Sequence, residues 1–271
     1  MRLTFLIDNA AKDEALAHEW GLCVHIAFEG QSILLDTGDS GAFVQNAAKL
    51  GVDLATVDFG VLSHAHYDHA NGLSAFFAIN ERAPFYLQKA ARENCYDRKG
   101  IIPHYIGVRK GTLSKFAGRI RFSEGKCEIA PKVWLLPHST PNLEEAGKRA
   151  HMLLRNGLRF APDGFAHEQS LVLCSGRGLV VFNSCSHAGA DTILSEAAAA
   201  FPDEKLYALI GGFHLFDAPD AQIITLAKRL AASPVERVLT GHCTGGHAYK
   251  LLKEDLGGRL ERFYTGLVVE L

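Results

Sequence analysis

The segment His64-Ala65-His66-Tyr67-Asp68-His69 constrains this chain more than any other part of its sequence. It follows Phe59–Leu62, a short apolar run that predicts a strand. Because side chains alternate along extended backbone, His64 and His66 point the same way and can share one metal ion. Asp68 and His69 can turn towards a second ion nearby. Zinc-type metals bind imidazole nitrogen and carboxylate oxygen, so the segment predicts a metal centre at a strand end. A histidine-rich surface loop is the alternative interpretation.

The patterns around this segment predict mixed α/β architecture, with helices covering more than one sheet face. Hairpins are expected in the first half and an alternation of strand and helix in the second half. Glu29-Gly30 indicates a hairpin of Cys23–Phe28 with Ser32–Asp36. Similarly, Ser175-Gly176-Arg177-Gly178 indicates a hairpin of Ser170–Cys174 with Leu179–Asn183. The expected strands are Leu3–Ile7, Cys23–Phe28, Ser32–Asp36, Phe59–Leu62, Phe85–Leu87, Val133–Leu136, Ser170–Cys174, Leu179–Asn183, Leu206–Ile210, Val238–Thr240 and Phe263–Val269. The expected helices are Ser40–Leu50, Leu73–Ile79, Thr192–Phe201, Ala221–Ala232 and Tyr249–Leu256.

Residues 95–130 differ from the rest because they are glycine-rich, basic and poorly periodic. We expect them to form a basic insertion or lid within a single domain that spans 1–271. They hold eight Lys or Arg and three Asp or Glu, a net charge of +5 in a chain whose total is −2. Such a lid would meet phosphate or carboxylate oxygens, so the expected partner is an anionic small-molecule substrate, with Arg98 and Lys99 as binding residues. A solvated surface loop is the alternative.

Composition excludes several classes of protein. The hydrophobic fraction of 48% and the charged fraction of 21% exclude a disordered chain or a coiled coil. The near balance of charge predicts no nucleic-acid partner, and the lack of a long apolar run predicts no membrane partner. The six cysteines are scattered without a CxxC pair, which is typical of thiols in a reducing compartment. With no export signal visible, we expect a cytoplasmic protein.

The hexapeptide resembles the HxHxDH signature of the metallo-β-lactamase superfamily. Asp36-Thr37-Gly38 resembles the upstream Asp motif of that superfamily, and Thr240-Gly241-His242 resembles its late His motif. The resemblance implies a four-layer αββα sandwich (the metallo-β-lactamase fold) with the metal site at one edge. It also implies two divalent metal ions, for which zinc is expected, with manganese or iron as alternatives.

Within the superfamily, three further motifs are similar to the subgroup related to dihydropterin/β-ribofuranosylaminobenzene 5′-phosphate synthase. These motifs are Cys185-Ser186-His187-Ala188-Gly189, Gly211-Gly212-Phe213-His214-Leu215 and His242-Cys243-Thr244-Gly245. Cys185 and Cys243 each adjoin a candidate ligand and are interpreted as buried fillers, with soft ligands or redox-sensitive thiols as alternatives.

The resemblance implies a set of metal ligands, and one position departs from the family pattern. Where the superfamily generally has an Asp that bridges the metals, this chain has His187, which either replaces that Asp or serves as the third imidazole. His167 is a rival for the third imidazole. The predicted ligands are His64, His66, Asp68, His69, His187 and His242.

Two further residues are expected to support the reaction. Asp36 is predicted to hydrogen-bond a ligand imidazole and fix its tautomer, although a simple turn would also explain it. His214 follows two glycines at a strand end, and substrate contact, general acid and ligand stay open for it. The predicted catalytic residues are Asp68 and His214.

The leading functional hypothesis is a dinuclear metal-dependent hydrolase, in which a metal-bound hydroxide attacks an ester, lactone, thioester or phosphoester. Asp68 would orient that hydroxide. A synthase-type condensation of a pterin with an arylamine phosphate, with loss of pyrophosphate, is the first alternative. Redox chemistry at a di-iron site is a second, but His66 departs from the HxExDH pattern of flavodiiron proteins. A non-catalytic metal-binding module is the third.

Overall fold

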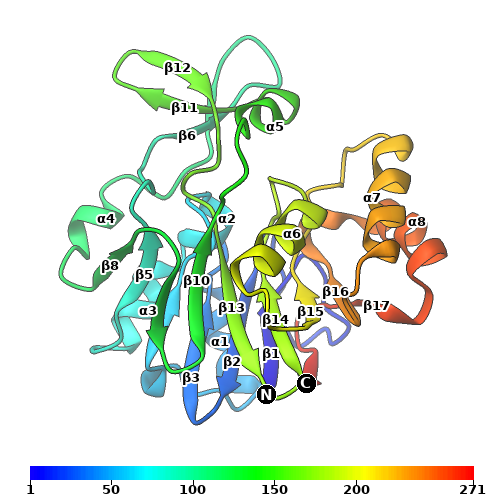
Figure 1. The fold of residues 1–271 in the computed structure, drawn as a ribbon. Coiled ribbons are helices and arrows are strands. Elements are labelled where there is room, and N and C mark those ends of the chain that lie inside the picture. The colour runs from blue at the N-terminus through cyan, green and yellow to red at the C-terminus, as the bar shows by residue number, and fades with distance from the viewer. The chain divides into compact units, whose positions relative to one another are not determined.

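The computed structural model describes all 271 residues, and they form two compact units. Unit 1 comprises Met1–Ser123, Asn142–Glu168 and Tyr264–Leu271, and unit 2 comprises Glu124–Pro141 and Gln169–Phe263. Each unit has its own seven-stranded sheet and its own helices (Figure 1). No helix is both long and apolar enough to cross a membrane. The single domain over 1–271 stays a prediction.

The large sheet of unit 1 contains the predicted hairpin. Strands β2 and β3 pair in antiparallel register, with Ile26 opposite Ile33, as the turn at Glu29-Gly30 predicts. The strands after β3 run parallel to it. In sheet order the strands are β18 (Val268–Glu270), β1 (Arg2–Ile7), β2 (Cys23–Phe28), β3 (Gln31–Leu35), β4 (Phe59–Val61), β5 (Phe85–Gln88) and β8 (Ile120–Ser123).

Two helices of unit 1 bury their apolar residues in one core with this sheet. Helix α1 (Ala42–Lys49) contributes Phe43, and α3 (Leu73–Ile79) contributes Phe76 and Phe77. The ring of Phe76 meets Phe85 of β5 edge-on at 5.6 Å. Burying such a side chain stabilises the fold by about 1.5–3 kcal/mol. The helices predicted over Ser40–Leu50 and Leu73–Ile79 are confirmed.

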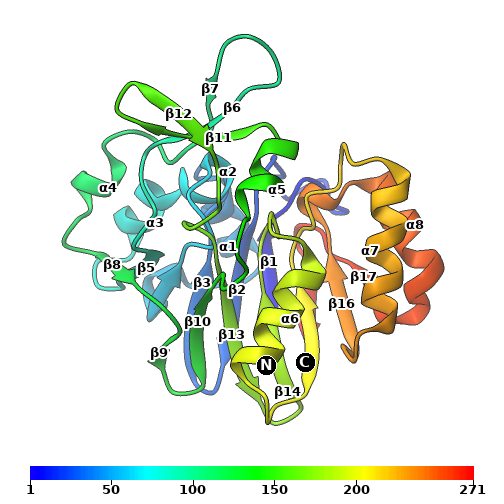
Figure 2. The same cartoon turned by 45° about the horizontal axis from the view of Figure 1, so that its top comes forward.

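Unit 1 also contains a four-stranded sheet that the sequence analysis did not predict (Figure 2). Its strands are β12 (Arg159–Pro162), β11 (Met152–Asn156), β6 (Cys95–Asp97) and β7 (His104–Tyr105), and α5 (Glu144–Arg149) precedes β11. The chain that leaves β7 contacts the histidine-rich segment directly. The N–H of Tyr67 donates to Ile106 O at 2.9 Å, and that of Val108 to Ala65 O at 3.1 Å. The backbone of this sheet is therefore joined to the candidate metal ligands.

Residues 95–130 do not form one insertion or lid. They contribute β6 and β7 to the small sheet, α4 (Thr112–Lys115), β8 to the edge of the large sheet of unit 1, and β9 (Cys127–Ala130) to the sheet of unit 2. Some of the basic residues are structural, because the Arg119 guanidinium donates to the carbonyl oxygens of Asn80 and Ala83. The segment lacks a clear period because most of its strands are short edge strands.

The sheet of unit 2 begins with antiparallel strands and continues with parallel ones. The predicted hairpin is present, with Val172 of β13 opposite Val181 of β14. Strands β14 to β17 are parallel, and their hydrophobic residues share a core with α6 (Ala190–Ala200), α7 (Asp220–Ala232) and α8 (Gly246–Leu256). In sheet order the strands are β17 (Leu260–Arg262), β16 (Arg237–Thr240), β15 (Leu206–Ile210), β14 (Gly178–Phe182), β13 (Gln169–Ser175), β10 (Val133–Pro137) and β9.

The predicted strand Phe263–Val269 is wrong. The chain leaves β17 at Arg262 and turns before it enters β18 of the other large sheet. In that turn Gly266 has a φ of 89°, and the N–H of Leu267 donates to Tyr264 O at 3.1 Å. Only Val268 and Val269 of the predicted run lie in a strand, because a glycine in the left-handed region interrupts the extended backbone before them.

Candidate metal centre

The histidine-rich segment begins where β4 ends and turns into helix α2 (Tyr67–Ala70). The backbone of His66 is still extended, with φ −92° and ψ 153°, and the helix starts at the next residue. His64 and His66 therefore lie on extended chain, whereas Asp68 and His69 lie on the first helical turn. All four side chains are buried. The change from strand to helix brings residues from both conformations to one place.

The carboxylate of Asp36 organises two of these histidines. Asp36 directly follows β3, is fully buried, and has a left-handed φ of 58°. Its Oδ1 accepts from the backbone N–H of Ser63 at 2.7 Å, and its Oδ2 accepts from Ser63 Oγ at 2.8 Å. Oδ2 also lies 2.8 Å from Nδ1 of His69. The sequence predicted a contact between Asp36 and a candidate ligand imidazole, and this contact is present, while its effect on metal binding stays a prediction.

These contacts determine the tautomers of both imidazoles. Nδ1 of His69 faces a carboxylate, so it carries the hydrogen. The single hydroxyl hydrogen of Ser63 is donated to Asp36, so Ser63 Oγ accepts from Nδ1 of His64, 2.8 Å away. Each ring therefore has its lone pair on Nε2, which is the atom that would bind a metal ion.

The donor set of unit 1 fits a divalent metal ion. One ligand atom from each of His64, Asp68 and His69 can be chosen so that all lie within 4.8 Å of one another. Oδ2 of Asp68 is 3.6 Å from Nε2 of His69, and the rings of His64 and His69 have centroids 4.2 Å apart. Imidazole nitrogen with carboxylate oxygen suits zinc and its neighbours in the first transition series.

His167 accepts a hydrogen bond from the backbone of the histidine-rich segment and adds no metal ligand to it. Its Nδ1 accepts from the backbone N–H of Ala65 at 3.2 Å, so its hydrogen is on Nε2, which donates to Asp163 at 2.9 Å. Both ring nitrogens are thus occupied within unit 1. His66 and Cys95 offer donor atoms within 4.8 Å of this pair. His167 was a rival for the third imidazole, and its hydrogen bonds argue against that role.

Unit 2 presents three histidines just beyond the C-terminal ends of parallel strands. His187 follows β14, His214 follows β15, and His242 follows β16. His214 and His242 have left-handed φ values of 47° and 46°, and Ser186 before His187 has 52°. Such conformations are costly for residues other than glycine, and they concentrate at functional sites. The rings of His187 and His214 are 4.7 Å apart. Metal binding by His187 and His242 stays a prediction.

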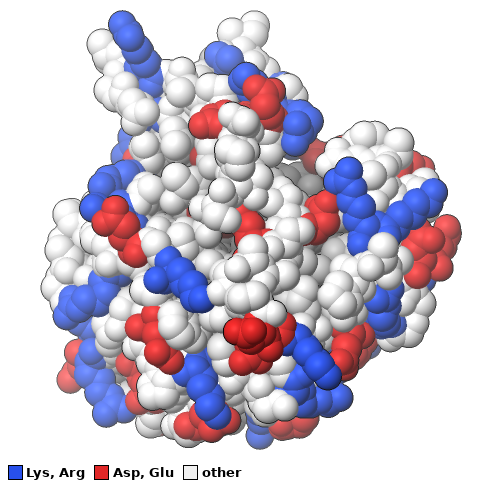
Figure 3. Space-filling view, in the orientation of Figure 1, with Lys and Arg blue, Asp and Glu red and all other residues white.

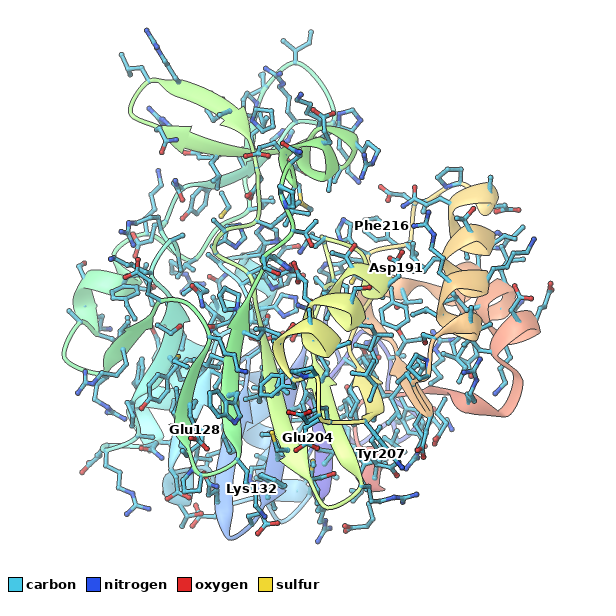
Figure 4. All side chains as sticks on the ribbon, in the orientation of Figure 1. Glu128, Lys132, Asp191, Glu204, Tyr207 and Phe216 are labelled. Carbon is cyan, nitrogen blue, oxygen red and sulfur yellow. The ribbon has the colours of Figure 1, made fainter.

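Two cysteines lie among these histidines. Cys185 and Cys243 are buried, and their Sγ atoms are 3.4 Å apart. Burial raises the pKa of the Cys243 thiol, but the contact with Cys185 and the imidazoles of His242 and His214 outweigh it, so this pKa lies well below its usual range. Phe216, labelled in Figure 4, lies in the segment after β15, with its ring 5.2 Å from that of His214.

The predicted substrate-binding residues Arg98 and Lys99 lie in the connection between β6 and β7 and are exposed. The N–H of Arg98 donates to His151 O at 2.8 Å, which holds its backbone in place. Sequence reasoning missed Ser63 and Asp163. Ser63 directly precedes a candidate ligand, which is a usable signal, whereas Asp163 became visible only through its contact with His167.

The chain has a sheet-based α/β fold, and buried imidazoles and carboxylates lie together after strand ends in unit 1. This combination is typical of metal-dependent enzymes with a metallo-β-lactamase fold. The chain belongs to the metallo-β-lactamase superfamily, whose family model matches residues 21–242. Members of this fold bind divalent metals. The predicted superfamily and fold class are thereby confirmed.

Particular relatives extend the similarity to the whole chain. A protein of Methanocaldococcus jannaschii named 7,8-dihydropterin-6-methyl-4-(beta-D-ribofuranosyl)-aminobenzene-5'-phosphate synthase is 27% identical, covering 98% of this chain and 95% of that protein. The crystal structure of Tm1679, described as a metal-dependent hydrolase of the beta-lactamase superfamily, is 30% identical with a TM-score of 0.85, covering 100% and 99%. Zn(2+)-bound PqqB from Methylobacterium extorquens shares the fold, with a TM-score of 0.60 at 11% identity over both whole chains.

Proposed function

We propose that this protein is a dinuclear metal-dependent hydrolase that acts on an anionic small molecule with an ester, lactone or phosphoester bond. Zinc is the proposed metal, since imidazoles dominate the donor set. The proposed ligands are His64, His66, Asp68, His69, His187 and His242.

The observation that carries this proposal is the hydrogen-bonding of Asp36 and Ser63. It leaves Nε2 of His64 and of His69 as lone-pair donors, while the carboxylate that fixes them is itself fully buried. A histidine that only filled the core would need no such fixed tautomer. Carboxylate–imidazole pairs of this kind raise the basicity of a metal ligand and hold its ring in one orientation.

The chemistry follows from what these residues do. Two bound divalent ions would lower the pKa of a coordinated water and stabilise the negative charge that develops on the substrate. Asp68 is proposed to accept a hydrogen bond from the attacking water and so to orient it. Asp36 and Ser63 keep the imidazoles from rotating, so the ligand geometry stays constant through the reaction.

The anionic character of the substrate is proposed from the small sheet of unit 1. Four exposed cations belong to this sheet. They are Arg98 and Lys99 in the β6–β7 connection, Arg155 on β11 and Arg159 on β12. Figure 3 shows Lys and Arg side chains on the projecting β11–β12 hairpin at the top of the view. Through Gly107 and Val108 the same sheet is joined to the backbone of His66 and Ala65. Cations placed there would bind phosphate or carboxylate groups.

One alternative function has an observation in its favour. The relative from Methanocaldococcus jannaschii, similar along almost the whole chain, is named as a synthase. A metal-assisted condensation that joins a pterin to an arylamine phosphate and releases pyrophosphate would use the same donor set.

Product analysis separates the two functions. Zinc-loaded protein is assayed with ester, lactone and phosphodiester substrates, and separately for pyrophosphate release from a pterin diphosphate with an arylamine phosphate. We expect hydrolysis, its loss in His69→Ala, and its retention in His247→Ala, which changes an exposed histidine of α8. Pyrophosphate release without hydrolysis would establish the alternative. Metal binding with neither reaction would indicate a non-catalytic module.

A further inference from the structure

Sulfur and imidazole donors gather at one edge of the sheet of unit 2. Cys185 follows β14, His214 follows β15 and Cys243 follows β16, and these three strands are parallel neighbours in the order β14-β15-β16. The carboxyl ends of parallel strands meet at the same edge of a sheet, which is where ligands bind in open α/β sheets. Topology therefore brings together three side chains that are far apart in the sequence.

The distances within this cluster suit chelation. Sγ of Cys185 is 3.4 Å from Sγ of Cys243, and the backbone N–H of His214 donates to Sγ of Cys243 at 3.2 Å, which holds His214 beside the two sulfurs. One donor atom from each of the three residues can be chosen so that all lie within 4.8 Å of one another. Zinc–sulfur bonds are about 2.3 Å long, so sulfurs at this separation would subtend an angle of about 95° at one ion, and a small outward shift of the two sulfurs would reach the tetrahedral angle of about 109°.

The backbone is built to allow this close approach. A Cβ at Gly212 would lie 2.5 Å from Sγ of Cys243, and a Cβ at Gly211 would lie 1.7 Å from the carbonyl oxygen of Asn183. Only glycine fits at these two positions, where β14, β15 and the Cys243 loop touch. His214 then adopts a left-handed φ, and its Nδ1 is buried without a hydrogen-bond partner.

Simple packing does not account for this arrangement. Two buried thiols could fill space as small hydrophobic groups. Core filling, however, requires neither a strained histidine nor a buried ring nitrogen that lacks a partner, which is costly unless something binds to it. A disulfide is not formed either, because the sulfurs are well beyond the bond length of about 2.05 Å.

We propose that Cys185, Cys243 and His214 bind a thiophilic divalent ion, with zinc as the expected metal, through two thiolates and one imidazole. This inference deepens the proposed function, on which it rests, because it gives sulfur ligands to one of the two proposed metal ions. Each cysteine loses its proton to the solvent when the metal–sulfur bond forms. A site with three protein ligands leaves a fourth position for water or substrate, and His214 acts as a ligand rather than as a proton donor.

Cobalt(II) tests the proposal because thiolate–cobalt bonds give charge-transfer absorption in the near ultraviolet, which imidazole and carboxylate ligands do not. The full-length protein is freed of metal, kept with a phosphine reductant so that the thiols cannot oxidise, and titrated with cobalt(II). Bound cobalt is counted in parallel by elemental analysis. The variants are Cys185→Ser, Cys243→Ser and, as the matched control, Cys174→Ser in β13, with folding checked by circular dichroism.

We expect a sulfur–cobalt band in the wild type and in Cys174→Ser. Each of the other variants should lose roughly half of it or more, because each removes one of two thiolates. Cobalt bound without the band, or a band unchanged by both cysteine variants, would overturn the proposal and leave the proposed function standing. A cysteine-dependent band with only one ion bound per chain would support the sulfur site and count against the dinuclear centre.

Discussion

Replacement of Asp36 by Asn tests the part of the centre that the structure defines best. Asp36 accepts three hydrogen bonds, two from Ser63 and one from His69. Asn has nearly the same shape and tolerates the left-handed backbone at this position, so the fold is not strained. The amide has only one acceptor oxygen. Where its NH₂ replaces Oδ2, it faces two hydrogen-bond donors, Ser63 Oγ–H and His69 Nδ1–H.

The expected loss of zinc affinity follows from this contact between three hydrogen-bond donors. His69 can relieve it by moving its hydrogen to Nε2, which removes the lone pair that would bind the metal ion. A hydrogen bond to a charged group contributes about 1.5–3 kcal/mol, and loss of a group that supports a metal ligand lowers metal affinity by about 10- to 100-fold. We therefore expect Asp36→Asn to bind zinc about 10- to 100-fold more weakly and to lose activity in parallel.

Competition with a chromophoric chelator measures the zinc affinity directly, and circular dichroism confirms that the variant is folded. The matched control is Asp58→Asn, which changes an exposed carboxylate of the same unit that also accepts from a backbone N–H, at 2.9 Å. The control should bind zinc as the wild type does. Wild-type zinc affinity in folded Asp36→Asn would refute the tautomer argument.

The other predictions concern stability and substrate charge. Glu196→Gln should lower the free energy of unfolding by about 1–2 kcal/mol at neutral pH. The reason is that the Glu196 carboxylate accepts a hydrogen bond from His138 at 2.8 Å and from two backbone N–H groups. The control is Glu236→Gln, which changes an exposed carboxylate. Burial raises the pKa of Glu196, but those contacts outweigh it and the pKa lies below its usual value of 4.5. The difference between the variants in urea denaturation should therefore be present above about pH 4.5 and vanish as the pH falls through the lowered pKa; a difference that grows on acidification would contradict this. The double variant Arg98→Ala/Lys99→Ala should raise KM for a phosphorylated ester more than for its neutral analogue. This difference should shrink at 1 M salt, where the Debye length is about 3 Å. Equal changes in both KM values would refute electrostatic binding.

The sequence predicted the elements whose pattern is local. The hairpin of β2 and β3, helix α3 and the alternation of strand and helix after β14 are found as expected, since each has a clear period or turn signal. The four-stranded sheet was missed because β7 has only two residues and β6 has three. Strand β6 pairs with β11, about fifty residues further along the chain. Such pairing depends on tertiary contacts that no local pattern encodes.

The candidate site, like the fold, was predicted where the sequence signal is local and missed where it is not. The histidine-rich segment and Asp36 were visible because ligand-type residues at short spacing are informative on their own. Asp163 and His167 act through a hydrogen bond to Ala65, about a hundred residues away in the sequence, and no spacing rule could have shown it. The basic segment was interpreted as one lid because its charge is local, whereas its strands belong to three sheets.

The metal content of protein purified without chelators tests the central claim most directly, when it is measured by elemental analysis for the wild type, His64→Ala and His247→Ala. The account predicts about two divalent ions per chain in the wild type and in the exposed His247→Ala control, as a dinuclear site requires. It predicts a loss of at least about one ion in His64→Ala, because the imidazole that Ser63 orients is gone. A wild-type protein free of transition metal, or a folded His64→Ala protein with the full metal content, would contradict it.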